Sequence, residues 1–268
     1  MNKLYHYTSI GTLYNMLEQS IFLDEETGTE YLNMRATHIN CLNDETERKL
    51  FTDMLIDKVR AYSNNLNDRQ IDRLKSLCNL NSYIISLSKH QDNLSMWRGY
   101  GGNGIGVNIE FDIHEITPYN KTLVPNQFKM EMVYGKSLFE CKYGKIDIDS
   151  SLVQKVYDYC INPECVFNEA KIIGAINNLA PIFKHEAYRE EGEWRFICNF
   201  YGSKPKYTYS NGTIKPYIEF PVPLSAITAI TIGPCIKDNY NISCIEQFIR
   251  DKLGKEVEIR YSKIPYRG

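Results

Sequence analysis

The segment from Arg189 to Phe196 most constrains what this chain can fold into, because it places three glutamates around one glycine and then turns apolar. An aromatic, apolar run that follows a charged turn is typical of a strand entering a core. We therefore predict a strand that begins at Glu193, with carboxylates at its N-terminal end. Gly192 would let a substrate approach the backbone closely. The competing interpretation is an acidic turn beside a charged strand edge.

The composition indicates an ordered chain without a general attraction for polyanions. Its 268 residues are 43% hydrophobic, which is enough for a full core and argues against disorder. The net charge is −2, so nucleic-acid binding would require a local basic patch. Twenty tyrosines and eleven phenylalanines favour strands and can stack on flat ligands.

The cysteines and the N-terminus predict a cytoplasmic protein. None of the eight cysteines forms a Cys-x-x-Cys pair or has a histidine at zinc-finger spacing, so we expect reduced thiols and no metal site. The first residues carry no apolar signal core, and no apolar run is long enough to span a bilayer. We therefore expect a soluble protein without a membrane partner.

Hydrophobic patterns predict an α+β chain around an antiparallel or mixed sheet. The expected strands cover residues 4–8, 83–88, 105–111, 129–134, a run from 193, 217–222, 226–232 and 256–261. The expected helices cover residues 10–21, a segment from 43, a short one from 68, a short one around 97, most of 151–187, and 243–253. Residues 24–42 are expected to be irregular and polar, with short extended pieces. We expect one domain over residues 1–268, with a helical insertion at about 151–187.

Two predicted helix starts carry capping residues. Asn43, Asp44 and Glu47 open the second helix, and we interpret them as capping residues rather than catalytic ones. Ser243 with Glu246 predicts a capping box at the last helix.

Two polar motifs end predicted strands. His6-Tyr7-Thr8 ends the first strand, and Ser86-Leu87-Ser88 ends the next. On a strand, Ser86 and Ser88 point to the same face. Taken singly, a histidine at a strand end is usually a half-buried polar group, and buried serines usually satisfy the backbone.

In two further pairs, the spacing in the sequence places both residues on the same face of a predicted helix or strand. Trp97 and Tyr100 lie three residues apart on a predicted short helix, and Glu191 and Glu193 alternate on the predicted strand. Most such aromatic pairs belong to the core, but we expect these rings to line a pocket and stack on a flat ligand. The two carboxylates would lie roughly 6–7 Å apart along the strand.

In this order, the histidine, the Ser-x-Ser pair and the Glu-x-Glu pair resemble the ADP-ribosyltransferase superfamily. Its members carry His or Arg on a first strand, Ser or Tyr on a second, and Glu at the start of a later one. His6-Tyr7 is similar to the poly-ADP-ribose-polymerase and diphtheria-toxin branch. The other two motifs are similar to the arginine-modifying toxin branch, and this mixture leaves the acceptor open.

The chain also resembles, over nearly its full length, a bacterial family of unknown function. The matching residues include Leu4 to Ser9, Asn43-Asp44 with Glu47, Ser86-Leu87-Ser88, Met96-Trp97 with Tyr100, Ile109-Glu110-Phe111, Lys184, Glu191-x-Glu193-x-Arg195 and Ile264 to Arg267.

The superfamily resemblance implies a split mixed sheet with flanking and inserted helices, and NAD as the substrate. It implies that Glu193 accepts a hydrogen bond from the ribose 2′-hydroxyl and stabilises the oxocarbenium-like charge that forms when nicotinamide leaves. Glu191 would activate the acceptor as a general base. Ser86 or Ser88 would orient Glu193 or touch the ribose.

The same resemblance implies how NAD is held. His6 would hold the adenosine ribose, and the backbone around Tyr7 and Thr8 would clasp the nicotinamide amide. Trp97 or Tyr100 would stack on the nicotinamide ring. Arg195 and Arg98 are candidate phosphate partners, although surface ion pairs explain either arginine equally well.

The resemblance also implies a biological setting: a toxin or anti-phage defence effector, acting on a protein or nucleic-acid acceptor and restrained by an inhibitory partner protein. Three other classes compete. A metal-dependent nuclease would draw on His6, Asp44, Glu47 and Glu193, but the sequence has no tight ligand spacing such as His-x-x-x-His. A cysteine hydrolase requires a thiol paired with a base, and none stands out. The main alternative is a non-catalytic module that binds a nucleotide or a partner.

Overall fold

The computed structural model describes residues 3–42, 47–63, 66–78, 81–116, 138–144, 147–162, 166–199, 204–210, 212–253 and 257–267. The strand predicted at 129–134, and Asn43 and Asp44 at the predicted helix start, lie outside these residues.

The described residues form the following strands: β1 (Lys3–Thr8), β2 (Ile21–Asp24), β3 (Thr29–His38), β4 (Ser82–Ser88), β5 (Val107–Asp112), β6 (Leu138–Glu140), β7 (Lys142–Tyr143), β8 (Phe183–Lys184), β9 (Glu193–Asn199), β10 (Lys206–Ser210), β11 (Thr213–Pro223), β12 (Ile227–Ile232) and β13 (Glu258–Tyr261). The α-helices are α1 (Ile10–Gln19), α2 (Glu47–Tyr62), α3 (Asp68–Leu77), α4 (Leu94–Gly99), α5 (Ile113–Ile116), α6 (Ser150–Ile161), α7 (Val166–Leu179) and α8 (Asn239–Leu253). Short 3-10 helices are η1 (Ile39–Cys41), η2 (Gly102–Gly104), η4 (Ala180–Ile182), η5 (Glu186–Glu191) and η6 (Leu224–Ala226).

The strands assemble into one large mixed sheet, which confirms the α+β class. Its main order is β10-β11-β3-β4-β1-β5-β12-β13, while β2 pairs with β3, β9 pairs with β4, and β6 pairs with β9. Neighbours in this sheet are antiparallel except β12 and β13, which are parallel. A separate parallel pair, β7 and β8, lies beside it.

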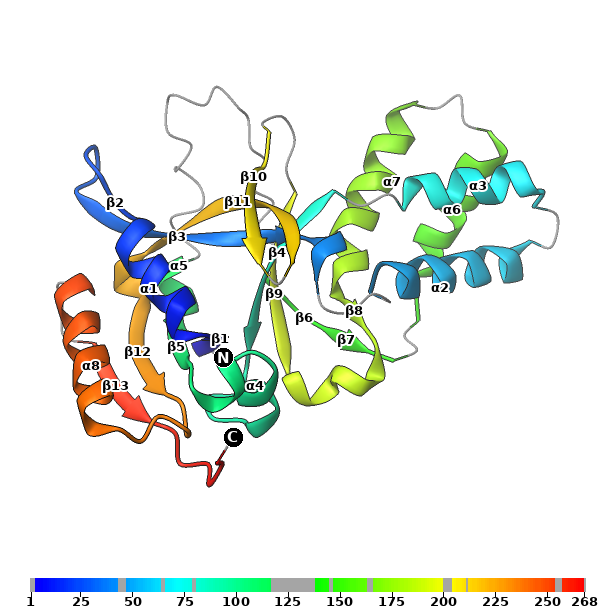
Figure 1. The fold of residues 1–268 in the computed structure, drawn as a ribbon. Helices are drawn as coiled ribbons and strands as arrows, with labels where there is room; N and C mark the ends of the chain where they lie inside the picture. The colour runs from blue at the N-terminus through cyan, green and yellow to red at the C-terminus, as the bar shows by residue number, and fades with distance from the viewer. Residues whose placement is uncertain are drawn as a thin grey trace.

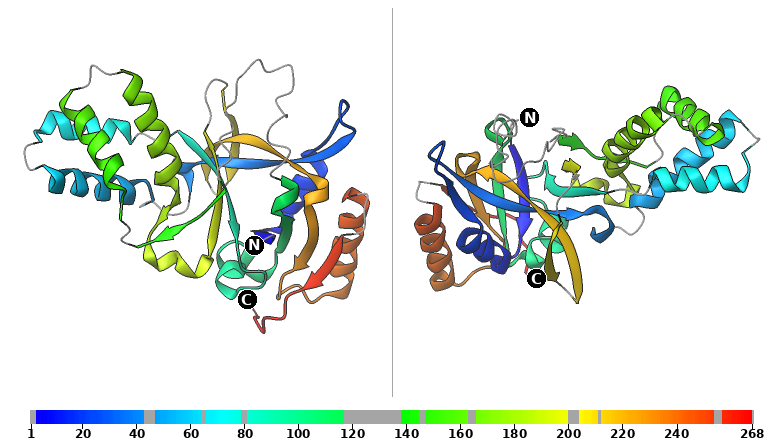
Figure 2. Two further views of the ribbon diagram at one scale, coloured as in Figure 1. Left: turned by 180° about the vertical axis from the view of Figure 1, so that it is seen from behind. Right: turned by 90° about the horizontal axis from the view of Figure 1, so that it is seen from above.

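Two hydrophobic cores meet at the centre of this sheet. One core packs α1, α5 and α8 against the sheet, and the other joins α2, α3, α6 and α7. Successive residues of β4 serve both, because Ile85 lies in the first core and Ile84 in the second. Figures 1 and 2 show the four helices of the second core as a group set apart from the others. The predicted insertion, α6 and α7, is thus joined by α2 and α3 from an earlier part of the chain.

Two sequence predictions about local structure are wrong. The segment expected to be irregular contains the ten-residue strand β3, which pairs with β11, β2 and β4. Helix α8 begins at Asn239, so Ser243 lies inside the helix and does not cap it. The Ser243 hydroxyl instead donates to the carbonyl of Asn239 at 2.9 Å, a bond that serine commonly makes to the preceding helical turn.

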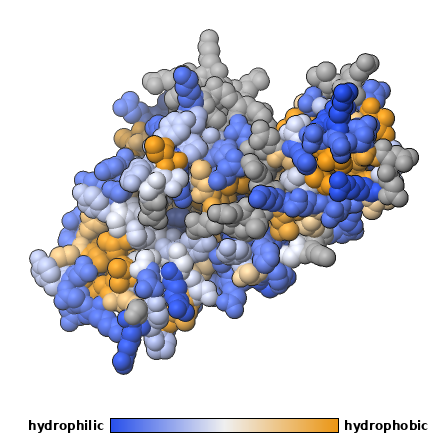
Figure 3. All heavy atoms as spheres, turned by 45° about the vertical axis from the view of Figure 1, so that its right-hand side comes forward, coloured by the Kyte–Doolittle hydropathy of each residue, from blue (hydrophilic) through white to orange (hydrophobic). Residues whose placement is uncertain are grey.

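The face that Figure 3 shows is mostly hydrophilic, with hydrophobic patches on the group of four helices and at the opposite end. None of the helices in the described ranges combines the length and the apolar character needed to cross a membrane. The seven described cysteines are free thiols, and four of them are buried.

Candidate functional site

The sheet opens beside β4, and a pocket lies at this opening. One edge of β4 pairs with β9 along its whole length. The other edge pairs with β3 at Tyr83 and Ile84 and with β1 only at Ser88. Between these points the Ser86 carbonyl accepts a hydrogen bond from Nδ1 of His6 at 3.1 Å. The pocket has a volume of about 200 Å³ and is lined from β1, β4, β9, α4 and η5.

The pocket brings together most of the residues that the sequence predicts for the site. Those that line it are His6, Tyr7, Ser86, Tyr100, Glu191, Glu193 and Arg195. They come from three distant parts of the chain, and the pairing of β1, β4 and β9 brings them to one place.

A buried ion cluster lies at the centre of the pocket. Arg195 donates to Glu193 twice, from Nε to Oε1 at 2.8 Å and from Nη2 to Oε2 at 2.9 Å. Lys184 Nζ donates to Glu193 Oε2 at 2.7 Å and to Glu191 Oε2 at 2.5 Å. Glu193 is 4% exposed, Arg195 1% and Lys184 3%, so these charges depend on one another rather than on water.

Lys184 and Arg195 keep Glu193 ionised. Burial alone raises the pKa of the Glu193 carboxyl, but the Arg195 guanidinium and the Lys184 ammonium more than reverse this effect and lower it to about 2. For Lys184, burial lowers the pKa and Glu193 raises it, with a net rise above its ordinary value. The cluster therefore joins two carboxyl side chains to two basic ones.

Tyr100 and His6 add a hydrogen-bond donor and an acceptor to the pocket. The Tyr100 hydroxyl donates to Glu191 Oε1 at 2.8 Å, and burial together with the Glu191 charge raises the pKa of Tyr100. Burial lowers the pKa of His6, and the Ser86 carbonyl only partly offsets this, so the imidazole is neutral at pH 7. Because Nδ1 donates to that carbonyl, Nε2 is an acceptor.

Gly192 and Ser88 place the two glutamates. Gly192 has φ +51, and a Cβ there would lie 2.6 Å from His90 Nε2, so any other residue would strain the backbone and displace the His90 side chain. The Ser88 hydroxyl donates to the Glu191 carbonyl at 2.6 Å and accepts from the His90 N–H at 3.1 Å. Ser88 thus fixes the backbone of this turn.

The left-handed turn at Gly192 corrects the prediction for Glu191. This residue ends the 3-10 helix η5 and does not lie on the strand with Glu193. Its carboxylate meets Glu193 because both accept from Lys184, rather than because they alternate along one strand.

Three predicted site residues do not line the pocket: Thr8, Ser88 and Trp97. Trp97 has no exposed surface, and its Nε1 donates to Asp92 Oδ1 at 2.6 Å, so the prediction that it lines the pocket is wrong. Thr8 is buried opposite Val107 at the end of β1. Trp97 packs edge-on against Tyr7, with ring centroids 4.9 Å apart.

The sequence analysis assigned no role to several residues that line the pocket. Lys184 belongs to the family resemblance, but nothing in the sequence places it beside Glu193. Lys215 and Tyr188 also line the pocket, from β11 and η5. Within the described part of the chain, Lys215 has no carboxylate partner, unlike the other two cations of the pocket.

Among the described residues, no group of three His, Cys, Asp or Glu side chains is arranged to hold a metal ion. Arg98, the other candidate phosphate partner, lies over the Tyr266 ring at 5.7 Å and does not line the pocket.

We expect the protein to lose stability in acid because of Glu193. Its folded-state pKa of about 2 lies below the usual 4.5, so the unfolded chain takes up this proton first as the pH falls. The ionised Glu193 therefore adds about 3 kcal/mol to the free energy of unfolding above pH 4.5, and this stabilisation is lost as the pH falls towards 2. Urea unfolding between pH 6 and pH 2.5 measures it, and Glu193→Gln should flatten the dependence. An equal slope in both proteins would contradict this assignment.

One family of known sequences matches the part of the chain that contributes the ion cluster to the pocket. A family described as "Protein of unknown function (DUF2971)" matches residues 96–196. This range contains Tyr100, Lys184, Glu191, Glu193 and Arg195, whereas the residues that β1 and β11 contribute lie outside it. No curated protein and no solved structure matches the chain. The family description names no activity, and nothing in these comparisons links the chain to ADP-ribosyltransferases.

Proposed function

We propose that the pocket binds NAD, that the protein cleaves the nicotinamide–ribose bond, and that ADP-ribose passes to a macromolecular acceptor. The observation that carries this proposal is the meeting of His6, Ser86 and Glu193 at one opening in the sheet. An ionised, buried carboxylate in such a site suits the stabilisation of a positive charge that develops during bond cleavage.

The size of the pocket suits one end of the dinucleotide. A volume of about 200 Å³ lies below the roughly 300–1,000 Å³ of pockets that bury a drug-sized ligand. Nicotinamide and its ribose would enter, and the remainder of NAD would lie along the mouth. Tyr100 and Tyr188, which line the pocket, are the aromatic residues that would contact the nicotinamide ring in place of the buried Trp97.

Glu193 retains a position for the ribose 2′-hydroxyl. Its Oε2 accepts from Lys184 and from Arg195, whereas Oε1 accepts only the Arg195 Nε among the described contacts. A carboxylate oxygen can accept two hydrogen bonds, so Oε1 has capacity for one more. Lys184 and Arg195 would hold this oxygen in place while NAD binds.

Glu191 would serve the acceptor. It lines a second cavity of about 300 Å³, which also touches Tyr100 and Tyr188 on the side of Ser95 and Glu190. An acceptor in this second cavity would reach the Glu191 carboxylate without displacing NAD from the first pocket. Tyr100 would orient that carboxylate through its hydroxyl.

Lys215 is the residue that we expect to contact the pyrophosphate, because the other pocket cations are already paired. Lys215→Gln should raise the KM for NAD at least about tenfold with little change in kcat, since a hydrogen bond to a charged group contributes roughly 1.5–3 kcal/mol. Lys206→Gln is the control: this exposed lysine lies on the neighbouring strand and is paired with Glu219 at 2.7 Å. Steady-state kinetics decide the matter, and equal KM values for the two variants would remove Lys215 from the NAD site.

A non-catalytic nucleotide-binding module is the second candidate. The observation in its favour is that Glu193 is already neutralised by two buried cations, so most of its hydrogen-bonding capacity is used within the protein. Such a module would bind NAD or ADP-ribose and release no nicotinamide.

Labelled NAD tests the proposal and sorts the acceptor. The purified protein is incubated with adenylate-labelled NAD and a cell lysate, and the products are digested separately with protease and nuclease. We expect label in a macromolecular fraction that one of the two digestions releases. Free ADP-ribose alone would make water the acceptor, and intact NAD after prolonged incubation would favour the binding module.

A further inference from the structure

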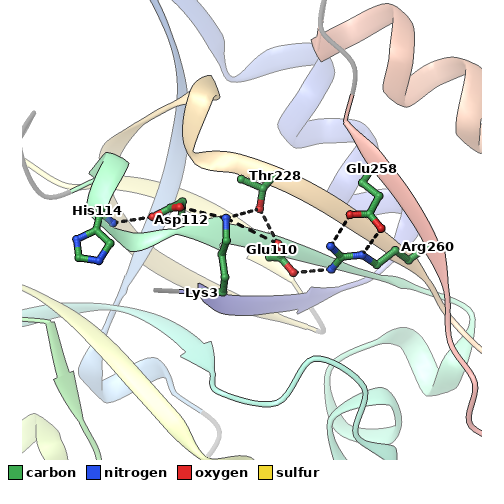
Figure 4. Close-up of polar contacts among 7 residues, drawn as sticks. All are labelled: Lys3, Glu110, Asp112, His114, Thr228, Glu258 and Arg260. Atoms are coloured by element: carbon green, nitrogen blue, oxygen red, sulfur yellow. Dashed lines mark hydrogen bonds and ion pairs between the residues drawn. The ribbon is translucent and has the colours of Figure 1, made fainter. Parts of the chain in front are cut away.

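Two acidic side chains outside the pocket connect the C-terminal residues to the pocket wall. The first is the buried Glu110 on β5, and Figure 4 shows its contacts with Arg260 and Thr228. Its Oε2 accepts from Arg260 Nη1 at 2.5 Å, and its Oε1 accepts from the Thr228 hydroxyl at 2.7 Å. Glu110 lies directly opposite Tyr5, a pocket residue, in the pairing of β1 with β5. Arg260 on β13 therefore binds a carboxylate that lies beside a pocket residue.

The second is Asp92, which precedes α4. Its Oδ1 accepts from Trp97 Nε1 at 2.6 Å and from the Ser262 hydroxyl at 2.7 Å. Its Oδ2 accepts from the backbone N–H of Lys263 at 2.9 Å. Trp97 lies on α4 beside Met96, which lines the pocket. One carboxylate thus ties the C-terminal residues to the helix that forms one wall of the pocket.

Apolar and polar contacts extend the same connection. Ile264 packs against the small core of Tyr7, Met96 and Trp97, which Tyr5 and Tyr100 also contact. The Tyr266 hydroxyl donates to Asn103 Oδ1 at 2.6 Å. The residues that follow Tyr261 form no helix or strand up to Arg267, so these side-chain contacts fix their path.

We propose that the segment from Glu258 to Arg267 is a positioning element of the pocket, which holds Tyr5 and the α4 wall where a ligand meets them. Its residues touch neither Glu191 nor Glu193 in any described contact, so it acts on binding through the wall. The activity readout of this inference rests on the proposed function, whereas a second readout does not.

Asp92→Asn is the test variant. The Asp92 carboxylate accepts three hydrogen bonds, and an amide in its place would point an N–H group at one or more of those donors. We expect the KM for NAD to rise about tenfold while kcat stays within about twofold. A general loss of folded protein would instead lower kcat and leave KM unchanged. Ile264→Ala, which removes an apolar contact, should change KM in the same direction.

Asp149→Asn is the matched control. Asp149 is also an exposed aspartate that accepts backbone N–H groups, here from Ser151 and Leu152 at the start of α6, far from the pocket in the fold. Its KM and kcat should equal those of the wild type. If Asp92→Asn gives the same KM as this control, the C-terminal segment does not position the pocket.

Hydrogen exchange of the ligand-free protein provides the readout that needs no NAD chemistry. We expect amides of α4 to exchange at least tenfold faster in Asp92→Asn, with those of α6 unchanged. If α4 exchange rises and NAD is not cleaved by the wild type, the positioning role stands and the proposed function fails. If α4 exchange is unchanged, the positioning role is wrong whatever the activity.

Discussion

Glu193→Gln should lower the free energy of unfolding by about 3–5 kcal/mol, because it leaves two buried cations with one fewer counter-charge. Arg195 is 1% exposed, and it directs Nε and Nη2 at the Glu193 carboxylate and Nη1 at the Pro181 carbonyl. A glutamine keeps one acceptor oxygen but presents an amide to the remaining donors. Urea unfolding followed by circular dichroism measures the loss.

Glu186→Gln is the control for this variant. Its side chain is 55% exposed and pairs with Arg189 three residues later, so its replacement should change the free energy of unfolding little. A loss below about 1 kcal/mol for Glu193→Gln would mean that the ion cluster does not stabilise the fold. A large loss means that this variant probes folding and chemistry together, so catalysis requires substitutions that keep the charge.

Glu191→Gln should slow transfer to the acceptor roughly 10²–10⁴-fold, the usual contribution of a general base, while NAD hydrolysis falls much less. The side chain of Glu191 is 13% exposed and lines both cavities, so it can meet an acceptor that Glu193 cannot reach. Water requires less assistance than a bound acceptor group. Parallel assays of nicotinamide release and label transfer separate the two effects.

Glu186→Gln is also the matched control for Glu191→Gln. Glu186 belongs to the same 3-10 helix, pairs with Arg189 and lines neither of the two cavities. Transfer and hydrolysis should both stay near wild-type rates. Equal losses of transfer and hydrolysis in Glu191→Gln would assign this residue to NAD cleavage or to the fold, and not to the acceptor.

Strong local patterns predicted much of the sheet. The apolar run of β4 and the strand beginning at Glu193 were predicted to within a residue, because both are rich in the aromatic and β-branched residues that strands favour. Strand β3 was missed because Glu30, Asn33 and Arg35 interrupt its apolar residues. Local pairing with β2 covers only Thr29 to Leu32, and the remainder of β3 pairs with β11 and β4, which lie far away in the sequence.

The sequence predicted most of the residues that meet at the pocket, but it did not predict which of them form ion pairs. Regular strand geometry brought His6, Ser86 and Glu193 together, as the motif order suggested. The approach of Lys184 to both glutamates depends on β8, a two-residue strand with no sequence signal of its own. Trp97 was assigned to the pocket because spacing on a short helix does not reveal which side faces the core.

The rate of nicotinamide release from NAD by the wild type and by Glu193→Asp tests the central claim most directly. Aspartate keeps the charge for Lys184 and Arg195 but withdraws the carboxylate by one methylene. We predict release by the wild type, a loss of about 100-fold or more in Glu193→Asp, and nearly unchanged ADP-ribose affinity, because misplacement of about 1 Å at a reacting group can cost this much. Wild-type protein that releases no nicotinamide with or without lysate, or a variant that matches the wild-type rate, would contradict NAD cleavage at this pocket.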